Sequence, residues 1–114
     1  MSQQLASFIR RTEPRGRVPL VVLADDSVPG GIGACLLYVD GYIRGPDGPW
    51  ERVPRNSTTT LVMPGTHRVT VREADRRKIG RMESNTLLVH FGARNGVLLG
   101  LSFNDGSLLL TQEA

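Results

Sequence analysis

The chain of 114 residues contains little cysteine, few aromatic residues and almost no lysine. Its single cysteine, Cys35, excludes an internal disulfide bond and a zinc site built on cysteine pairs, and its apolar neighbours favour a role in packing. Aromatic residues make up 5% of the sequence, so we expect a core of Val, Leu and Ile. Lys78 is the only lysine, so arginine supplies nearly all of the positive charge. The planar guanidinium group of arginine is suited to binding carboxylate or phosphate. A genome rich in G and C also favours arginine over lysine, without any function attached.

Long hydrophobic runs are also missing. No stretch approaches the roughly 20 apolar residues that a membrane-spanning helix needs, and residues 1–17 lack the apolar centre of a secretory signal. We therefore expect a cytoplasmic protein without a membrane span. The length is that of one domain, so we predict a basic N-terminal arm over residues 1–17, flexible or with a short helical turn, and a single domain over residues 18–114.

Short runs of β-branched and aliphatic residues alternate with clusters of turn-forming residues. This pattern predicts an all-β fold, a single antiparallel β-sandwich or small open barrel of about seven or eight short strands. The run 18–23 contains Pro19, which favours a short strand at the edge of a sheet. The run from Gly33 to Val39 is apolar on both faces, as expected for a central strand, and Asp40-Gly41 should close a tight turn after it.

The C-terminal part of the chain is predicted to form an antiparallel β-meander. Asn95-Gly96 and Asp105-Gly106 are strong hairpin signals, and each lies between two apolar runs. The runs expected to pair are 86–91, 97–103 and 107–111. In the middle run, one face should point into the core, and its residues are Val97, Leu99, Leu101 and Phe103.

Two short motifs resemble a known family. One is Tyr38-Val39-Asp40-Gly41, and the other is Met63-Pro64-Gly65-Thr66-His67-Arg68-Val69-Thr70-Val71. Together they resemble PEGA domains, small β-sandwich modules of bacterial envelope and signalling proteins, over about residues 33–73. The resemblance implies a non-catalytic interaction module and carries no catalytic residues.

Basic residues gather in the N-terminal arm and in a central segment. From His67 onward, apolar and polar residues alternate, which places Arg68 and Arg72 on the solvent face of one strand. The predicted binding patch consists of Arg68, Arg72, Arg76, Arg77, Lys78 and Arg81. This patch could contact a protein partner, or together with the arm the phosphates of a nucleic acid, or it could be a solvated face without a ligand.

A further candidate for binding is Trp50. With Tyr42 and the loop 45–49 it could form a platform for a carbohydrate, and the alternative is that it covers the edge of the core. The two histidines, His67 and His90, lack the local spacing of metal ligands, so we expect no metal and no cofactor. No nucleophile elbow or phosphate-binding loop is visible, so we expect no enzyme.

The function we expect first is a non-catalytic protein-interaction or assembly module. Its contact surface would be a strand edge near residues 18–23 or the face that carries the arginines, because open strand edges invite pairing. Self-association as a homodimer is one form of this function. Nucleic-acid binding through the arm and the arginine face, and carbohydrate binding around Trp50, are the alternatives.

Overall fold

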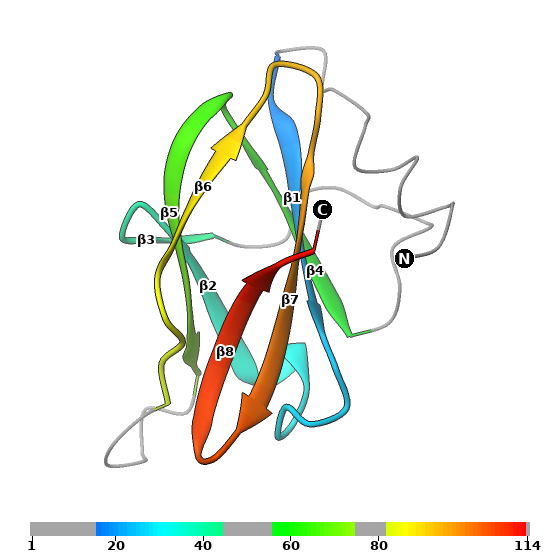
Figure 1. Cartoon of the computed structure of the whole chain (residues 1–114), viewed down its shortest axis with the longest axis vertical. Coiled ribbons are helices and arrows are strands. Elements are labelled where there is room, and N and C mark those ends of the chain that lie inside the picture. The colour runs from blue at the N-terminus through cyan, green and yellow to red at the C-terminus, as the bar shows by residue number, and fades with distance from the viewer. Residues whose placement is uncertain (1–15, 45–55, 75–81, 114) are drawn as a thin grey trace.

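A computed structural model describes residues 16–44, 56–74 and 82–113. These residues form eight strands in two four-stranded sheets that pack face to face, as Figure 1 shows. The predicted all-β class is confirmed, and the form is a small β-sandwich with two separate sheets. No helix in the described ranges is long and apolar enough to cross a membrane.

Each sheet draws its strands from distant parts of the sequence. In sheet A the order is β4 (Ser57–Val62), β1 (Val18–Ala24), β7 (Val97–Asn104) and β8 (Ser107–Gln112). In sheet B it is β3 (Tyr42–Arg44), β2 (Cys35–Val39), β5 (Gly65–Glu73) and β6 (Leu87–Phe91). A short 3-10 turn, η1 (Ile32–Ala34), leads into β2. The pairing of β1 with β7 is parallel, and the other strand pairs are antiparallel.

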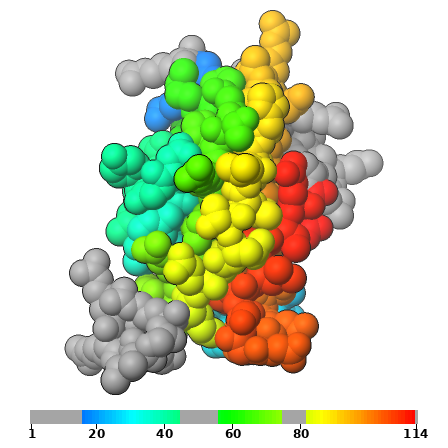
Figure 2. Space-filling view, turned by 60° about the vertical axis from the view of Figure 1, so that its left-hand side comes forward, coloured from blue at the N-terminus to red at the C-terminus, as the bar shows by residue number. Residues whose placement is uncertain are grey.

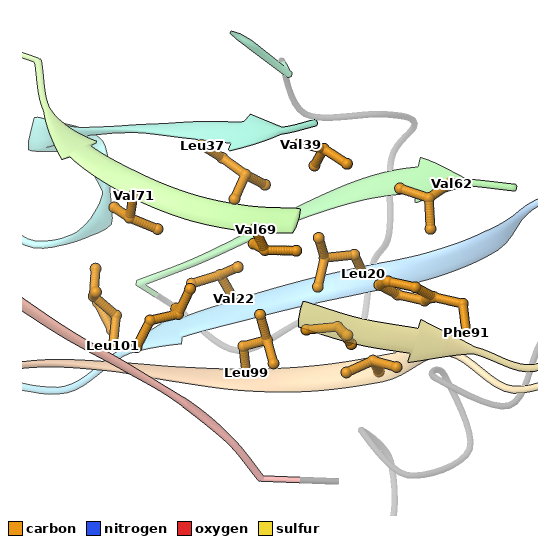
Figure 3. Packing of buried hydrophobic residues seen from close by; sticks show 14 of the residues in the cluster. Leu20, Val22, Leu37, Val39, Val62, Val69, Val71, Phe91, Leu99 and Leu101 are labelled. Carbon is orange, nitrogen blue, oxygen red and sulfur yellow. The ribbon is translucent and has the colours of Figure 1, made fainter. Parts of the chain in front are cut away.

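The core between the sheets is almost entirely aliphatic, as the low aromatic content predicts. Leu20 and Val22 of β1 face Val69 of β5 across the interior, and Leu99 of β7 lies beside them, as Figure 3 shows. Among the described residues, Phe91 is the largest fully buried side chain. Burial of a side chain of this kind stabilises the fold by about 1.5–3 kcal/mol, so the core is the main source of stability.

The prediction that residues 18–23 form an edge strand is wrong. Strand β1 pairs with β4 on one side and with β7 on the other, which makes it an inner strand. Val21, on the face directed away from the core, is 0% exposed, so the strand is buried on both faces. Pro19 is compatible with this position because the pairing of β1 with β7 begins only at Leu20. The strand-edge contact proposed for residues 18–23 is therefore excluded.

The predicted C-terminal meander is correct only in its second half. Strands β7 and β8 form the expected hairpin, with Asp105 and Gly106 at φ values of 51° and 77°. Strands β6 and β7 belong to different sheets, so the chain crosses the sandwich between them. Neither Asn95 nor Gly96 has a positive φ, so this Asn-Gly pair does not form the tight turn that a two-residue hairpin needs.

The other local predictions hold where they can be compared. The central strand predicted over residues 33–39 is β2, an inner strand of sheet B, but it begins at Cys35 because Gly33 and Ala34 belong to η1. The turn at Asp40 and Gly41 leads directly into β3, with φ values of 53° and 85°. The N-terminal arm, apart from Gly16 and Arg17, lies outside the described residues. The inward face predicted for β7 is confirmed at Val97, Leu99 and Leu101, while Phe103 is only partly buried against the core.

Candidate functional site

The outer face of sheet B carries the arginines that the sequence singles out. Strand β5 lies between β2 and β6, and its side chains alternate as predicted, with Val69 and Val71 buried and Arg68 and Arg72 exposed. The strand register places Tyr38 and Leu88 on the same outer surface. Figure 2 looks towards this side of the molecule, where β2, β3, β5 and β6 lie next to one another. We call this surface the Arg face, and its residues are Tyr38, Ile43, Arg68, Thr70, Arg72, Thr86 and Leu88.

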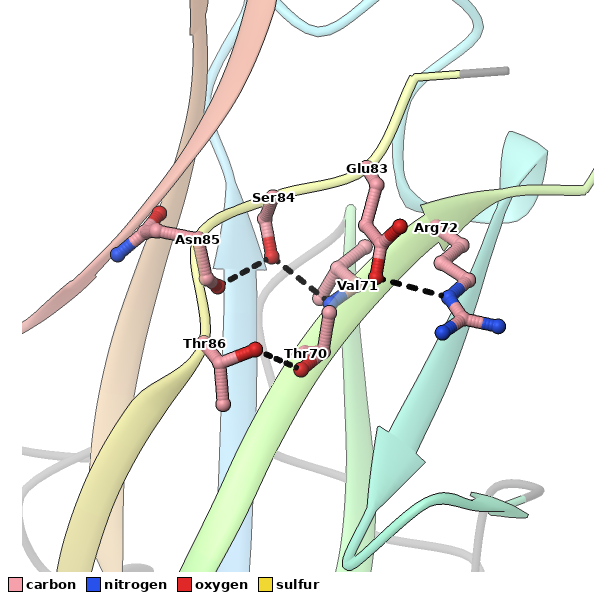
Figure 4. A network of polar contacts seen from close by, with 7 residues as sticks. All are labelled: Thr70, Val71, Arg72, Glu83, Ser84, Asn85 and Thr86. Carbon is pink, nitrogen blue, oxygen red and sulfur yellow. Dashed lines mark hydrogen bonds and ion pairs between the residues drawn. The ribbon is translucent and has the colours of Figure 1, made fainter. Parts of the chain in front are cut away.

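Arg72 is held in place by two contacts. Its guanidinium carbon lies 4.6 Å from the centre of the Tyr38 ring, and its Nε atom lies 3.1 Å from Oε1 of Glu83, as Figure 4 shows for the ion pair. Both side chains of the ion pair are about half exposed, so solvent screens it and its contribution to stability is at most about 1 kcal/mol. The contacts orient the guanidinium group, and within the described residues its two terminal amino groups make no further hydrogen bond.

Arg68 differs from Arg72 in its surroundings. Among the residues that the structure describes, Arg68 bonds to another side chain only through its backbone N–H, which donates to Oδ1 of Asp40 at 2.9 Å. Within the described ranges, the Arg68 guanidinium makes no ion pair or hydrogen bond. Directly opposite on β6 lies Leu88, which is 69% exposed. The Arg face therefore places an unpaired cation beside an exposed aliphatic side chain.

Between the two arginines the surface is hollowed. The hollow has a volume of about 450 Å³ and is lined by Tyr38, Asp40, Gly41, Arg68, Thr70, Arg72 and Thr86. At its edge the hydroxyl oxygens of Thr70 and Thr86 lie 2.8 Å apart in a hydrogen bond. Gly41 adds no side chain, and nothing lies within 4 Å of the position that a Cβ atom would take there.

The segment before β6 fixes one border of the Arg face. Ser84 Oγ accepts a hydrogen bond from the backbone N–H of Val71 at 2.9 Å and donates to the carbonyl of Asn85 at 2.8 Å (Figure 4). The amide of Asn85 then pairs with both backbone groups of Leu110, at 2.9 Å and 2.8 Å. Segment 83–86 is thereby attached to β5 in sheet B and to β8 in sheet A, which positions Glu83 and Thr86.

At one end of the Arg face, the two turn motifs noted in the sequence contact each other. Nδ1 of His67 lies 2.6 Å from Oδ2 of Asp40, and its Nε2 lies 2.7 Å from the carbonyl oxygen of Met63. The ring also contacts Phe91 edge to face, with centroids 5.5 Å apart. Because both nitrogens face acceptors, the protonated imidazolium, which donates from both, satisfies the two contacts together.

The ionisation of this pair follows from its contacts. Burial alone would lower the pKa of His67, but the hydrogen bonds to Asp40 and to Met63 outweigh it and raise the pKa above the usual 6.5. The hydrogen bonds that His67 and the Arg68 backbone donate lower the pKa of Asp40 below 3.8. Both groups therefore carry a charge across the mildly acidic range, and they fix the turn between β2 and β3 to the start of β5.

The structure brings together only part of the predicted binding patch. Arg68 and Arg72 share one face, as predicted. The other predicted site residues lie outside the described residues, and they are Trp50, Arg76, Arg77, Lys78 and Arg81. Tyr42, the aromatic partner proposed for Trp50, is 76% exposed on β3.

Sequence reasoning did not identify the other residues of the Arg face, which include Tyr38 and Thr86, or Glu83, which pairs with Arg72 at its border. Alternation along β2 would have placed the Tyr38 side chain opposite the core, but pairing it with Arg72 requires the register between β2 and β5. No sequence pattern marks Glu83 and Thr86 as site residues. They lie in the segment before β6, and their contacts with Arg72 and Thr70 of β5 form only in the folded chain. The site is therefore a product of long-range strand pairing.

The reactive residues elsewhere do not assemble into a second site among the described residues. Within them, no group of three or more His, Cys, Asp and Glu residues could hold a metal ion. His90 contacts Thr66 instead, with Nδ1 and Oγ1 3.2 Å apart. Burial, with a smaller effect of the Glu73 charge, raises the pKa of the Cys35 thiol, so its reactive thiolate form is disfavoured.

Comparisons with protein-family models, with curated proteins and with solved structures find no match for this chain. The class that the structure defines is therefore that of its fold, a small β-sandwich with an arginine-bearing outer face. Membership of the PEGA family stays a prediction that depends on the two turn motifs.

Proposed function

We propose that this protein is a non-catalytic protein-interaction module that binds its partner through the Arg face of sheet B. The observation that carries the proposal is the composition of this surface. It combines Arg68 and Arg72 with Tyr38 and with two exposed aliphatic residues, Ile43 and Leu88. Tyr and Arg are enriched at the centres of protein interfaces, whereas Lys and Glu are depleted there.

The rigidity of the surface supports the same proposal. Its arginines project from β5, an inner strand that is paired on both sides. The stacking of Arg72 on Tyr38 and its ion pair with Glu83 limit the side-chain freedom that would be lost on binding. A partner would therefore meet a surface whose shape changes little. The resemblance to PEGA domains favours the same class of function.

Nucleic-acid binding has less support. The ring of Tyr38 is covered by the Arg72 guanidinium, so this face of the ring is occupied rather than open to a base. Glu83 also offsets part of the positive charge of Arg72. Of the residues proposed for carbohydrate binding, the exposed Tyr42 is described, while Trp50 and the loop 45–49 lie outside the described ranges.

The partner could be a different protein or a second copy of this chain. Sedimentation velocity over a dilution series separates these forms, because a homodimer dissociates on dilution and a monomer does not change. If the chain dimerises through the Arg face, Arg68→Glu should shift the equilibrium to monomer. A dimer that survives this substitution would use another surface.

Site-specific photocrosslinking tests the contact surface directly. Leu88 and Leu109 are exposed leucines on the outer faces of the two different sheets, with 69% and 46% exposure. A photoreactive amino acid placed at either position in the native host should give a covalent adduct from position 88 and none from position 109. Adducts from position 109 alone, or from neither position, would refute the proposal.

A further inference from the structure

We infer that the hollow on the Arg face binds an extended acidic segment of the partner, in which two carboxylates four residues apart contact Arg68 and Arg72. This inference rests on the proposed function and adds the chemistry of the partner. The segment would lie along β5 over the outer surface of the sheet. It would not extend the sheet, because β5 already pairs with β2 and β6.

Charge complementarity identifies the segment as acidic. One acidic residue, Asp40, lines the hollow, and it is already paired with His67; Glu83 lies outside this lining and pairs with Nε of Arg72. Among the described residues, neither the Arg68 guanidinium nor the terminal amino groups of Arg72 have an ion-pair or hydrogen-bond partner. An incoming carboxylate would therefore meet the Arg68 guanidinium and the terminal amino groups of Arg72, although Glu83 offsets part of the Arg72 charge.

The spacing of the arginines sets the spacing of the carboxylates. Arg68 and Arg72 are four residues apart on one strand, so their Cα atoms are separated by about 13 Å at a rise of about 3.3 Å per residue. An extended partner segment has the same rise, and its residues four apart point to the same side. Residues three apart point to opposite sides, so only one of them could reach the hollow.

The shape of the hollow also fits a short acidic side chain. Its volume of about 450 Å³ lies at the low end of ligand pockets, and Gly41 leaves backbone uncovered at its rim. The hydroxyl groups of Thr70 and Thr86 offer further hydrogen-bonding groups beside the arginines. Leu88, next to Arg68, can cover the apolar stem of a glutamate.

A peptide titration followed by amide NMR spectra tests the inference. The probe is a serine- and threonine-rich peptide with two glutamates four positions apart, and the matched control has the same composition with the glutamates three positions apart. The first peptide should shift the amide signals of Arg68, Thr70 and Leu88 and bind several-fold more tightly than the control. Arg68→Gln should weaken its binding by roughly tenfold, the loss expected for a charged hydrogen bond. The same substitution at the exposed Arg94, outside the Arg face, should leave binding unchanged.

Three results would overturn the inference: no shift with either peptide, equal binding of both peptides, or binding of an oligothymidine probe in place of the peptides. The last result would show that the Arg face binds nucleic acid, and the affinity for the oligothymidine probe would then fall steeply as the salt concentration rises. Failure of the peptides with a persistent adduct from position 88 would leave the proposed function standing. Loss of that adduct itself would refute the proposed function independently.

Discussion

Replacing His67 with Phe tests the contact between the two turn motifs. Phenylalanine keeps a ring against Phe91 but removes the two donors that reach Asp40 and the Met63 carbonyl. A hydrogen bond from a charged group contributes about 1.5–3 kcal/mol when it is shielded from water. The Asp40 side chain is 47% exposed, so solvent offsets much of that contribution. We expect the substitution to lower the free energy of unfolding by about 1–3 kcal/mol at mildly acidic pH.

The loss of stability caused by His67→Phe should depend on pH. The pKa of His67 is raised in the folded state, so its contribution is complete below the unfolded value of 6.5 and is lost as the pH rises through the folded pKa. The pKa of Asp40 is lowered, so its contribution is complete above 3.8 and is lost as the pH falls through the folded pKa. The difference between wild type and His67→Phe should therefore be largest between pH 3.8 and pH 6.5.

Urea unfolding followed by far-ultraviolet circular dichroism, at a series of pH values, measures this difference. The titration of groups that both proteins share contributes equally to their free energies of unfolding and cancels in the difference. The pH dependence of that difference therefore comes from His67 and its contacts. His90→Phe is the matched control, because His90 is exposed and contacts only Thr66 within the described ranges. A difference between wild type and His67→Phe that does not decrease as the pH rises above 6.5 would refute the reasoning.

Three further substitutions test the fold. Leu99→Ala should lower the free energy of unfolding by about 2–5 kcal/mol, measured by urea denaturation, because it leaves a cavity in the core. Gly41→Ala should lower the free energy of unfolding by about 1 kcal/mol, because the backbone φ of 85° at this position is unfavourable for alanine. Gly33→Ala is the control: an added Cβ atom would meet no atom within 4 Å at either position, but Gly33 has no positive φ, so this cost is absent. Asn85→Ala should reduce the hydrogen-exchange protection of the Leu110 amide, whereas Asn85→Asp should retain most of it, since a carboxylate still accepts from that N–H although it cannot donate to the Leu110 carbonyl.

The all-β class and the alternation along β5 could be predicted because both depend on local sequence. A period of two fixes the side of the sheet to which Arg68 and Arg72 point, whatever strand lies beside them. The tight turns at Asp40-Gly41 and Asp105-Gly106 were predictable for the same reason, since few residue types accept their positive φ values.

The errors arose where one local signal competed with a long-range one. Pro19 suggested an edge, but the continuous apolar run around it is the pattern of a strand buried on both faces, and that pattern prevailed. Asn95-Gly96 suggested a hairpin, but β6 pairs with β5 and β7 with β1, which places the two strands in different sheets. Neither pairing can be deduced from neighbouring residues.

The contacts that shape the candidate site are also long-range. The sequence shows Asp40 and His67 as parts of two separate turn motifs, and only the pairing of β2 with β5 places them 2.6 Å apart. The same pairing brings Arg72 over Tyr38. Strand register, which the sequence does not specify by itself, therefore determines the chemistry of the Arg face.

The central claim, that the Arg face is the contact surface, is tested most directly by combining the crosslink at position 88 with charge reversal. The two backgrounds are Arg68→Glu, on the Arg face, and Arg94→Glu, an equal change of charge at an exposed position in the loop between β6 and β7. We predict that the adduct disappears with Arg68→Glu and persists with Arg94→Glu. Equal adduct yields in the two backgrounds would contradict the claim.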